Sequence, residues 1–322
     1  MMPNESVDGT TQLVVDASEA GARLDVFLAR RQAVPSAAAA RRAVASGIVR
    51  VGGHPAKKGM HLQLGDVVDL GEGSIPAIVL QPTPELTLTV LYQDGDLVAV
   101  DKPAGIASHP LRSGDGPTVA SALVARFPEC AAASPDAREG GLGHRLDLGT
   151  SGVLLAARSR EAWHRLREAL ATAACEKIYL AEVCGRFPSA EEQPFVLPGP
   201  RPSSFVVTAP IGRQGRRGSK VKLAAGRQPL PARTEITLLE TRPGGALVEA
   251  RLAHGRAHQV RAHLAHLGIP VAGDATYGEV DDAPLAVLHL HAWVVSIIHP
   301  ITAKLLRIEA PLPTWAQRMG LG

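Results

Sequence analysis

The sequence predicts an α+β protein in two parts: a small N-terminal α+β domain, and a larger domain built on a mainly antiparallel, mixed sheet. The chain has 322 residues, enough for about two domains, and 45% of them are hydrophobic, which suffices to form cores. A Gly- and Pro-rich stretch after residue 70 is typical of a linker. Beyond it, strand patterns joined by hairpin turns alternate irregularly with helices, as in α+β folds.

We therefore expect four segments along the chain. They are an N-terminal tail over residues 1–20, the small domain over 21–70, the linker over 71–85 and the large domain over 86–322.

The small domain is predicted to combine two helices with short strands. Leu24, Phe27 and Leu28 are three and four residues apart, so they share one face of the first helix. The other elements are a second helix from Pro35-Ser36 to Gly47, with Ser36 as its N-cap, and strands over 48–51 and 66–70.

This segment is also the basic part of the chain. Residues 21–70 hold eight Lys or Arg against three Asp, a net charge of +5, whereas the whole chain carries +3. The layout of two helices, a strand, a basic turn and a strand resembles an S4-like RNA-binding domain. The resemblance implies that Arg41 and Arg42 on the second helix contact RNA. The alternative is a small solvated appendage.

In the large domain the predicted elements follow in order. They are a hairpin turning at Asp94-Gly95-Asp96, a helix over 118–126, a strand over 153–157, a helix capped by Ser159, a strand over 177–183, a helix ending at Gly268, and strands over 285–298 and 303–310 joined by a turn at 299–302.

Several classes of protein are disfavoured. Aromatic residues make up only 3% of the chain, which argues against reading single-stranded RNA mainly by stacking. The three cysteines form no CxxC pair, which fits a reducing cytoplasm. No signal peptide is visible, and no apolar run approaches the ~18 residues of a membrane span. We expect a cytoplasmic protein that does not contact membranes.

The first motif with chemical potential is the Gly-rich loop GLGHRLDLGTSG, residues 141–152. It holds Asp147 between Arg145 and the hydroxyls of Thr150 and Ser151, just before an apolar strand. Glycines let another chain approach the backbone closely. Taken alone, an Asp beside an Arg equally fits a capped turn or a salt bridge.

The second motif is HGRAHQVRAHL, residues 254–264. His254 and His258 have the spacing of a zinc pair, but no third ligand follows, and Gly255 stands where a zinc hydrolase would carry its Glu. We therefore predict no metal site, and interpret the histidines as caps or phosphate contacts. The third motif is KIYLAEV, where Tyr179 alternatively is a tyrosine on a half-buried strand.

In combination these motifs resemble the RluA-type family of RNA pseudouridine synthases over about residues 86–314. The ordered set is DKPAG at 101–105, HRLD at 144–147 with TSG at 150–152, K-x-Tyr at 177–179, GR-x-HQVR at 255–261, GD at 273–274, YG at 277–278, LHA at 290–292, HP at 299–300 and APLP at 310–313. A chance match of the whole ordered set is negligible.

The resemblance implies the activity and its residues. Such enzymes isomerise uridine to pseudouridine, which needs no cofactor. By similarity Asp147 is the essential carboxylate, acting as nucleophile or as base, and Arg261 pairs with it. Tyr179 corresponds to the tyrosine that stacks on the target base, with removal of the C5 proton as an alternative role. Leu264 corresponds to the apolar residue that lines the pocket.

Further residues are expected to contact RNA. By similarity His144 and Arg145 hold the target nucleotide out of its stack. The remaining predicted contacts are Thr150, Arg256 and a basic loop with Arg213, Arg216, Arg217 and Lys220, whose alternative is an exposed solubilising loop. The chain departs from the family at Leu148-Gly149, at His254 and at Ala257, which puts the RNA target in doubt.

The expected partner is ribosomal RNA of the large subunit, with transfer RNA as an alternative, and a monomer is expected. Two other functions stay open. One is a non-catalytic RNA-binding factor of ribosome assembly. The other is a glycosidic hydrolase, which needs two carboxylates, with Asp101 or Asp274 as the partner of Asp147.

Overall fold

The structure is a computed structural model. It describes residues 5–7, 10–34, 37–71, 80–111, 115–172, 174–188, 195–213, 221–223, 229–252, 255–278 and 287–317. The predicted N-cap Ser36 and most of the predicted linker lie outside these residues.

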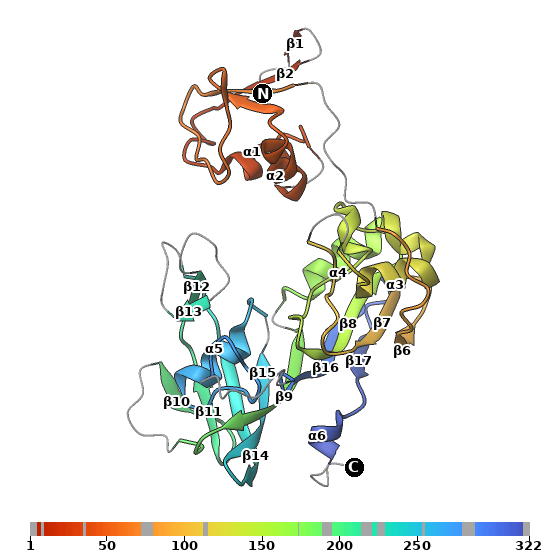
Figure 1. The fold of residues 1–322 in the computed structure, drawn as a ribbon, viewed down its shortest axis with the longest axis vertical. Coiled ribbons are helices and arrows are strands. Elements are labelled where there is room, and N and C mark those ends of the chain that lie inside the picture. Colours follow the sequence, from red (N-terminus) through yellow and green to blue (C-terminus); the bar gives the residue numbers. More distant parts are fainter. Residues whose placement is uncertain are drawn as a thin grey trace.

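The N-terminal domain is a five-stranded sheet with two helices packed on it (Figure 1). Its elements are β1 (Glu5–Val7), β2 (Thr10–Val14), α1 (Leu24–Arg30), α2 (Ala37–Ala45), β3 (Val49–Val51), β4 (His54–Pro55) and β5 (Val67–Leu70), with strand order β1-β2-β5-β3-β4. Leu24, Phe27 and Leu28 are all buried in one hydrophobic core, as their spacing predicts.

The sheet of this domain also includes a strand from upstream of residue 21. Strand β2 lies in the segment assigned to the tail, yet it pairs with β5, with Leu13 opposite Val68. Leu13 and Val15 are buried in the core of the domain. Without β2, one edge of β5 would be unpaired, and one side of the hydrophobic core would be exposed to solvent.

The large domain is organised on a sheet of ten strands (Figure 1). The strand order is β10-β11-β14-β15-β9-β16-β8-β7-β6, and β17 pairs with β16. The strands are β6 (Thr89–Gln93), β7 (Leu97–Lys102), β8 (Ser151–Ala157), β9 (Glu176–Cys184), β10 (Val196–Pro198), β11 (Ser204–Val207), β14 (Thr234–Arg242), β15 (Gly245–Leu252), β16 (Leu290–Ile298) and β17 (Leu305–Glu309). A separate hairpin pairs β12 (Ile211–Arg213) with β13 (Val221–Leu223).

The sheet is mixed because of a single parallel pair. Strand β16 runs parallel to β8, with His291 opposite Ser151 and Ala292 opposite Gly152, and the other pairings are antiparallel. Gly152 has φ +108, and a Cβ there would overlap the backbone of Ala292. A mainly antiparallel, mixed sheet in an α+β chain confirms the predicted fold class.

Helices cover both faces of the sheet. They are α3 (Val119–Arg126), α4 (Arg160–Ala169), α5 (Gln259–His266) and α6 (Thr314–Gln317), with 3₁₀ turns at Pro128–Ala132 and Ala137–Glu139. Leu154 packs in the core under α3, whereas its neighbour Leu155 packs in the core under α4, so these helices lie on opposite faces. Tyr179 contacts the cores of both α3 and α5, which places these two on the same face.

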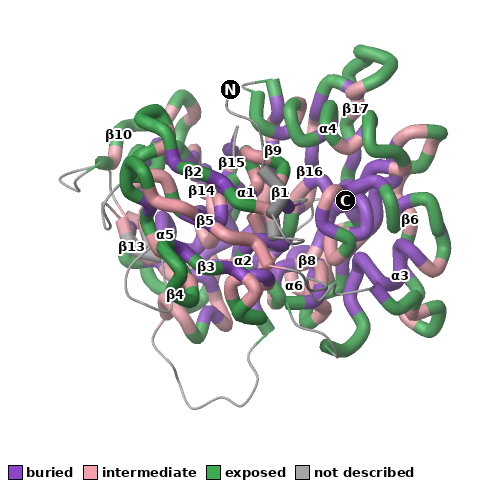
Figure 2. The backbone as a smooth tube through the Cα atoms, turned by 90° about the horizontal axis from the view of Figure 1, so that it is seen from above, coloured by how far each residue is buried: buried purple, intermediate pink, exposed green. Residues whose placement is uncertain are grey.

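The helix start predicted at Ser159 and the helix end predicted at Gly268 are both present. Thr118 accepts a hydrogen bond from the backbone of Ser121 at the start of α3, and Ser159 accepts one from Ala162 at the start of α4. Gly268 ends α5 with φ +74. Figure 2 shows that buried positions concentrate on the strands of the sheet, while exposed positions lie in the connections.

Candidate active site

The loop that carries Asp147 leads directly into β8, and its backbone is held on both sides. Before Asp147, the hydroxyl of Ser108 donates to Leu146 O (2.9 Å) and accepts from Leu146 N (3.1 Å). After it, Leu148 O accepts from the amide of Gly105 (2.9 Å). The segment that follows β7 therefore fixes the backbone on both sides of Asp147.

A buried lysine completes this clamp. Lys102 is fully buried at the end of β7, and its ammonium donates to Pro103 O (2.8 Å) and to Leu148 O (3.1 Å). Burial lowers the pKa of Lys102 to about 8, although the negative charges of Asp147 and Asp101 oppose this shift. The lysine thus links the loop of Asp147 to the end of β7.

Arg261 on α5 lies between two carboxylates. Its Nη1 donates to Asp147 Oδ2 (2.8 Å), while its Nε and Nη2 both donate to Asp274 (2.7 Å each). Burial alone would lower the pKa of Arg261, but the hydrogen bonds to Asp274 and Asp147 raise it overall. The pairing of Arg261 with Asp147 that the sequence predicts is therefore present, across 114 residues of chain.

Asp274 is not available as a second catalytic carboxylate. Its side chain is completely buried, and although burial opposes it, Arg261 holds the pKa of Asp274 below its ordinary value. Since Asp274 and Asp147 bind the same guanidinium, they do not flank an open space that could hold a glycosidic bond. This pair does not form the hydrolase site considered above.

His258 and Tyr277 form a wall beside Asp147. His258 Nδ1 lies 3.1 Å from the Tyr277 hydroxyl, and its Nε2 lies 3.8 Å from Asp147 Oδ2. The Tyr277 ring lies over the guanidinium of Arg261, 5.3 Å from it. Burial lowers the pKa of His258. His258 adopts φ +56, a left-handed conformation that is uncommon outside glycine and is often found at functional sites.

Tyr179 lies on β9, at the centre of the same sheet face. It packs against the cores under both α3 and α5, and its backbone is paired with Ala250 and Ala292 on the neighbouring strands. Burial, together with the charge of Asp147, raises the pKa of Tyr179, so the phenol keeps its proton at neutral pH. Leu264 is fully buried in the core that Tyr179 contacts.

The RNA contacts predicted around this loop divide into two groups. Arg145 is exposed beside Asp147, as an RNA contact requires. His144 instead accepts a hydrogen bond at Nε2 from Leu155 N (3.2 Å), and burial lowers its pKa to about 3, so it is neutral and turned toward β8. Thr150 is buried and donates its amide to Asp147 O (3.1 Å). These two residues shape the loop.

Of the basic residues farther from Asp147, only some lie among the described residues. Arg256 is partly exposed, with Nε 3.5 Å from Pro231 O. The backbone of Arg213 lies on β12, and its side chain is not among the described ones. Arg216, Arg217 and Lys220 lie outside the described residues.

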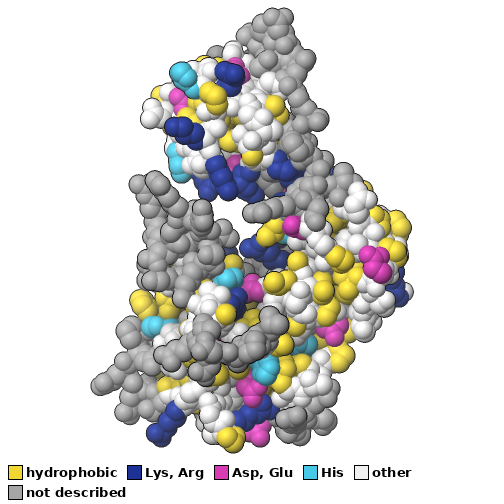
Figure 3. All heavy atoms as spheres, in the orientation of Figure 1, with side chains coloured by type: hydrophobic (Ala, Val, Ile, Leu, Met, Phe, Trp, Pro, Cys, Tyr) yellow, Lys and Arg dark blue, Asp and Glu magenta, His cyan; other side chains and the backbone are white. Residues whose placement is uncertain are grey.

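On the N-terminal domain the two predicted arginines differ. Arg41 donates to Asp25 (2.8 Å) and stays 44% exposed. Arg42 lies 3.9 Å from Asp136 of the large domain, with its Nε and Nη1 buried and without a hydrogen-bond partner. In Figure 3, Lys and Arg side chains gather on the side of the N-terminal domain that faces the large domain.

One cluster in the described residues has the spacing of a metal site. Asp94, Asp96 and His299 lie at the two hairpin turns, β6–β7 and β16–β17. His299 Nε2 contacts Asp94 Oδ2 (2.9 Å), and its Nδ1 accepts from the amides of Ile301 and Thr302. Because both ring nitrogens are engaged, the cluster ties two turns together. His254 lies outside the described residues.

Sequence reasoning named the candidate catalytic residues but not the residues that hold them in place. Lys102 and Tyr277 belong to motifs noted in the sequence, DKPAG and YG, yet no local pattern states what their side chains contact. Ser108 carries no signal at all. For His258 the signal was present, since it follows GRA directly before a helix, and only its direction toward Asp147 was unknown.

Comparisons with known proteins show which proteins this chain is similar to. Residues 96–266 match the RNA pseudouridylate synthase family, and residues 22–68 match the S4 domain. An uncharacterized RNA pseudouridine synthase of Mycobacterium bovis is 36% identical over 302 residues, covering 91% of this chain and 92% of the relative. Ribosomal large subunit pseudouridine synthase D of Xanthomonas campestris is 31% identical over 326 residues, covering 96% and 91%.

A solved structure gives the same result for the fold. Human RNA pseudouridylate synthase domain containing 1 superposes with a TM-score of 0.54 at 26% identity, covering 72% of this chain and 86% of the human chain. None of the helices in the described residues combines the length and the hydropathy that crossing a bilayer requires.

Proposed function

Because this chain belongs to the RluA-type family of RNA pseudouridine synthases, we propose that it isomerises specific uridines of large-subunit ribosomal RNA, with Asp147 as the essential carboxylate. The observation that carries the proposal is the Asp147 carboxylate, fixed by Arg261 on the sheet face where Tyr179 lies. The relatives named for large-subunit ribosomal RNA support the choice of substrate.

The reaction breaks the N1–C1′ bond of uridine, turns the uracil and joins its C5 to C1′; the C5 hydrogen leaves as a proton to solvent, and N1 takes up a proton. In either mechanism the carboxylate must be ionised, whether it attacks C1′ or removes a proton at C2′. Arg261 stabilises that charge through Asp147 Oδ2. No hydrogen bond of the described residues reaches Oδ1, which leaves this oxygen for the sugar.

The detached uracil needs a surface that keeps it near C1′. Tyr179 offers an aromatic ring between the two halves of the sheet. We assign Tyr179 to stacking, because its ring packs against the cores of both halves of the sheet.

Binding of the RNA requires the target uridine to leave its stack, at a cost of a few kcal/mol. Phosphate contacts offset this cost. We assign them to the exposed Arg145 at the active site and to the basic face of the N-terminal domain, where Arg41 remains partly exposed.

The test is release of tritium from large-subunit ribosomal RNA transcripts labelled at uridine C5. The wild type and Glu161→Gln, a control on the exposed side of α4, should both release tritium, and Asp147→Asn should not. Release by Asp147→Asn at the wild-type rate would show that the carboxylate is assigned wrongly. Tritium release from transfer RNA alone would show that large-subunit ribosomal RNA is not the substrate. Tight, salt-sensitive binding without release from any RNA would favour the assembly factor.

A further inference from the structure

We propose that Asp274 is a positioning residue for the reaction: it orients Arg261 so that only Nη1 meets Asp147. The inference rests on the proposed role of Asp147. Asp274 binds the Nε–Nη2 edge of the guanidinium, and it acts on the reaction only through Arg261.

The guanidinium of Arg261 binds its two carboxylates unequally. A carboxylate binds arginine most strongly along one edge, through two parallel hydrogen bonds. Asp274 occupies the Nε–Nη2 edge with two bonds of 2.7 Å, whereas Asp147 receives a single bond of 2.8 Å from Nη1. The stronger, two-point contact therefore goes to the residue that does no chemistry.

Asp274 is itself rigidly held. Its Oδ1 accepts from the amides of Thr276 (2.9 Å) and Tyr277 (3.2 Å), and its side chain has no exposed surface. The turn around it is closed by Asp274 N to Val271 O (3.1 Å) and Gly278 N to Asp274 O (2.8 Å). A carboxylate fixed in this way defines the plane and the direction of the guanidinium that binds it.

The face of the guanidinium is also covered. Tyr277, three residues after Asp274 in the same turn, places its ring over the Arg261 guanidinium at 5.3 Å. With one edge and one face occupied from the same turn, Arg261 has a single orientation.

This orientation has a chemical consequence. If the Nε–Nη2 edge were free, Arg261 could bind both oxygens of Asp147 and leave neither for the sugar. Asp274 prevents this, so the carboxylate is stabilised through Oδ2 while Oδ1 stays available. Removing the charge of Asp274 should therefore slow the chemical step without weakening RNA binding.

The experiment compares the single-turnover rate and the RNA dissociation constant of wild type and Asp274→Asn. A misdirected reacting group can cost about 10²-fold in rate, and we expect a loss of that order with an RNA affinity unchanged within about twofold. An unchanged rate, or a loss confined to affinity, would overturn the proposal.

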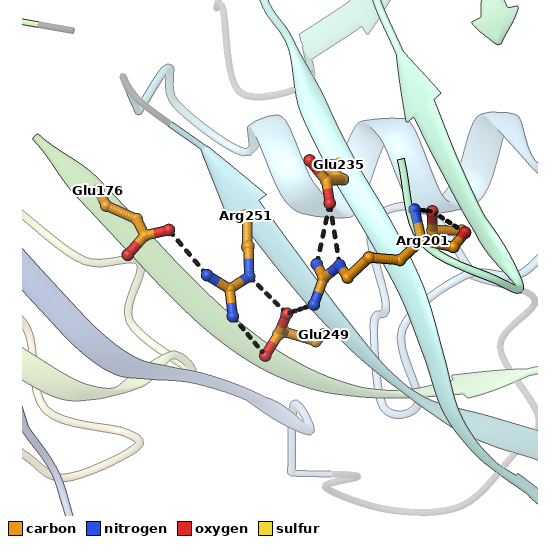
Figure 4. Close-up of polar contacts among 6 residues, drawn as sticks. Glu176, Arg201, Glu235, Glu249 and Arg251 are labelled. Atoms are coloured by element: carbon orange, nitrogen blue, oxygen red, sulfur yellow. Dashed lines mark hydrogen bonds and ion pairs between the residues drawn. The ribbon is translucent and has the colours of Figure 1, made fainter. Parts of the chain in front are cut away.

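A matched control separates positioning from stability. Glu249 on β15 is also buried and bound by two arginines, accepting from Arg201 Nη1 (2.9 Å) and from Arg251 Nε (2.6 Å) and Nη2 (3.3 Å) (Figure 4). Glu176 and Glu235 complete this network. Glu249→Gln should lower thermal stability as Asp274→Asn does, but leave the single-turnover rate unchanged. An equal loss of rate in both variants would mean that Asp274 is merely structural.

A double variant tests whether Asp274 acts through Arg261. In an Arg261→Lys background the bidentate contact is already absent, so adding Asp274→Asn should cost little further rate. If the two losses multiply, Asp274 has an independent role and the proposal is wrong.

A measurement without RNA keeps this inference separate from the proposed function. The Nε–H of Arg261 should give a slowly exchanging ¹⁵N–¹H signal in wild type, identified by its loss in Arg261→Lys. It should weaken or shift in Asp274→Asn. Absence of such a signal from the wild type would overturn the proposal, even if Asp274→Asn does not fold. Failure of the wild type to modify RNA while the signal is present would reject the proposed function alone.

Discussion

Replacing Lys102 by Met should change how the stability of this protein depends on pH. Lys102 is fully buried, and its pKa falls from the ordinary value of 10.5 to about 8, chiefly because burial disfavours the charged form. That difference of pKa corresponds to about 3 kcal/mol of stability. The variant carries no proton at this position, so it isolates the contribution.

The sign follows from which state binds the proton. Below pH 8 both the folded and the unfolded chain hold it, and the fold carries the full cost of the buried charge. Between pH 8 and 10.5 the folded protein has released the proton and the unfolded chain still binds it. The free energy of unfolding therefore rises with pH in this interval because of Lys102.

The assay is urea-induced unfolding of wild type and Lys102→Met at pH 7, 8, 9, 10 and 11. Contributions from other groups, including the buried Lys177, are common to both proteins and cancel in the difference. The stability of the wild type relative to the variant should increase by about 3 kcal/mol from the lowest to the highest pH. Parallel curves would refute the reasoning, since they would mean that the lysine titrates alike in both states.

The variant should also lose activity on the order of tenfold at pH 7.5, because Leu148 O loses a donor.

Three further outcomes are expected. Gly152→Ala should destabilise the protein by about 1–3 kcal/mol in urea unfolding, because the new Cβ overlaps the backbone of Ala292; a neutral effect would contradict the close approach of β8 and β16. Arg145→Gln should reduce the salt dependence of RNA binding by about 0.7–0.9 in the slope of log K against log salt, measured by filter binding, and an unchanged slope would remove Arg145 from the RNA interface. Tyr179→Leu should cost about 1–3 kcal/mol of transition-state stabilisation in single-turnover kinetics, whereas Tyr179→Phe keeps the ring and should lose less; the opposite order would assign the function to the hydroxyl.

The elements of the fold were largely predictable because local signals specify them. Ser159 and Gly268 mark a helix start and a helix end by side-chain and backbone chemistry alone. Strand β2 was missed because Val14, between the buried Leu13 and Val15, is itself apolar, so no polar alternation marks the strand, and its partner β5 is not revealed by any local pattern. The parallel pairing of β16 with β8 was equally hidden, because it joins segments about 140 residues apart.

The site was predictable only in part, for a related reason. Asp147 and Arg261 follow from the resemblance to a family, and their ion pair is present. Asp274 was, with Asp101, a candidate second carboxylate of the alternative hydrolase, because a sequence cannot show that an arginine already binds Asp274. The contact of the Ser108 hydroxyl with the backbone of Leu146 depends on how the chain packs, and no spacing of residues in the sequence predicts such a contact. The cytoplasmic location, the domain limits and the monomeric state stay predictions.

The position of β16 has a consequence for how the site is held together. This strand lies between β8, which follows the loop of Asp147, and β9, which carries Tyr179. Because β16 is hydrogen-bonded to both neighbours, it acts as a spacer that sets the distance between the carboxylate and the aromatic ring. A substitution in β16 that weakens either pairing would therefore alter the geometry of the site without replacing any residue of it.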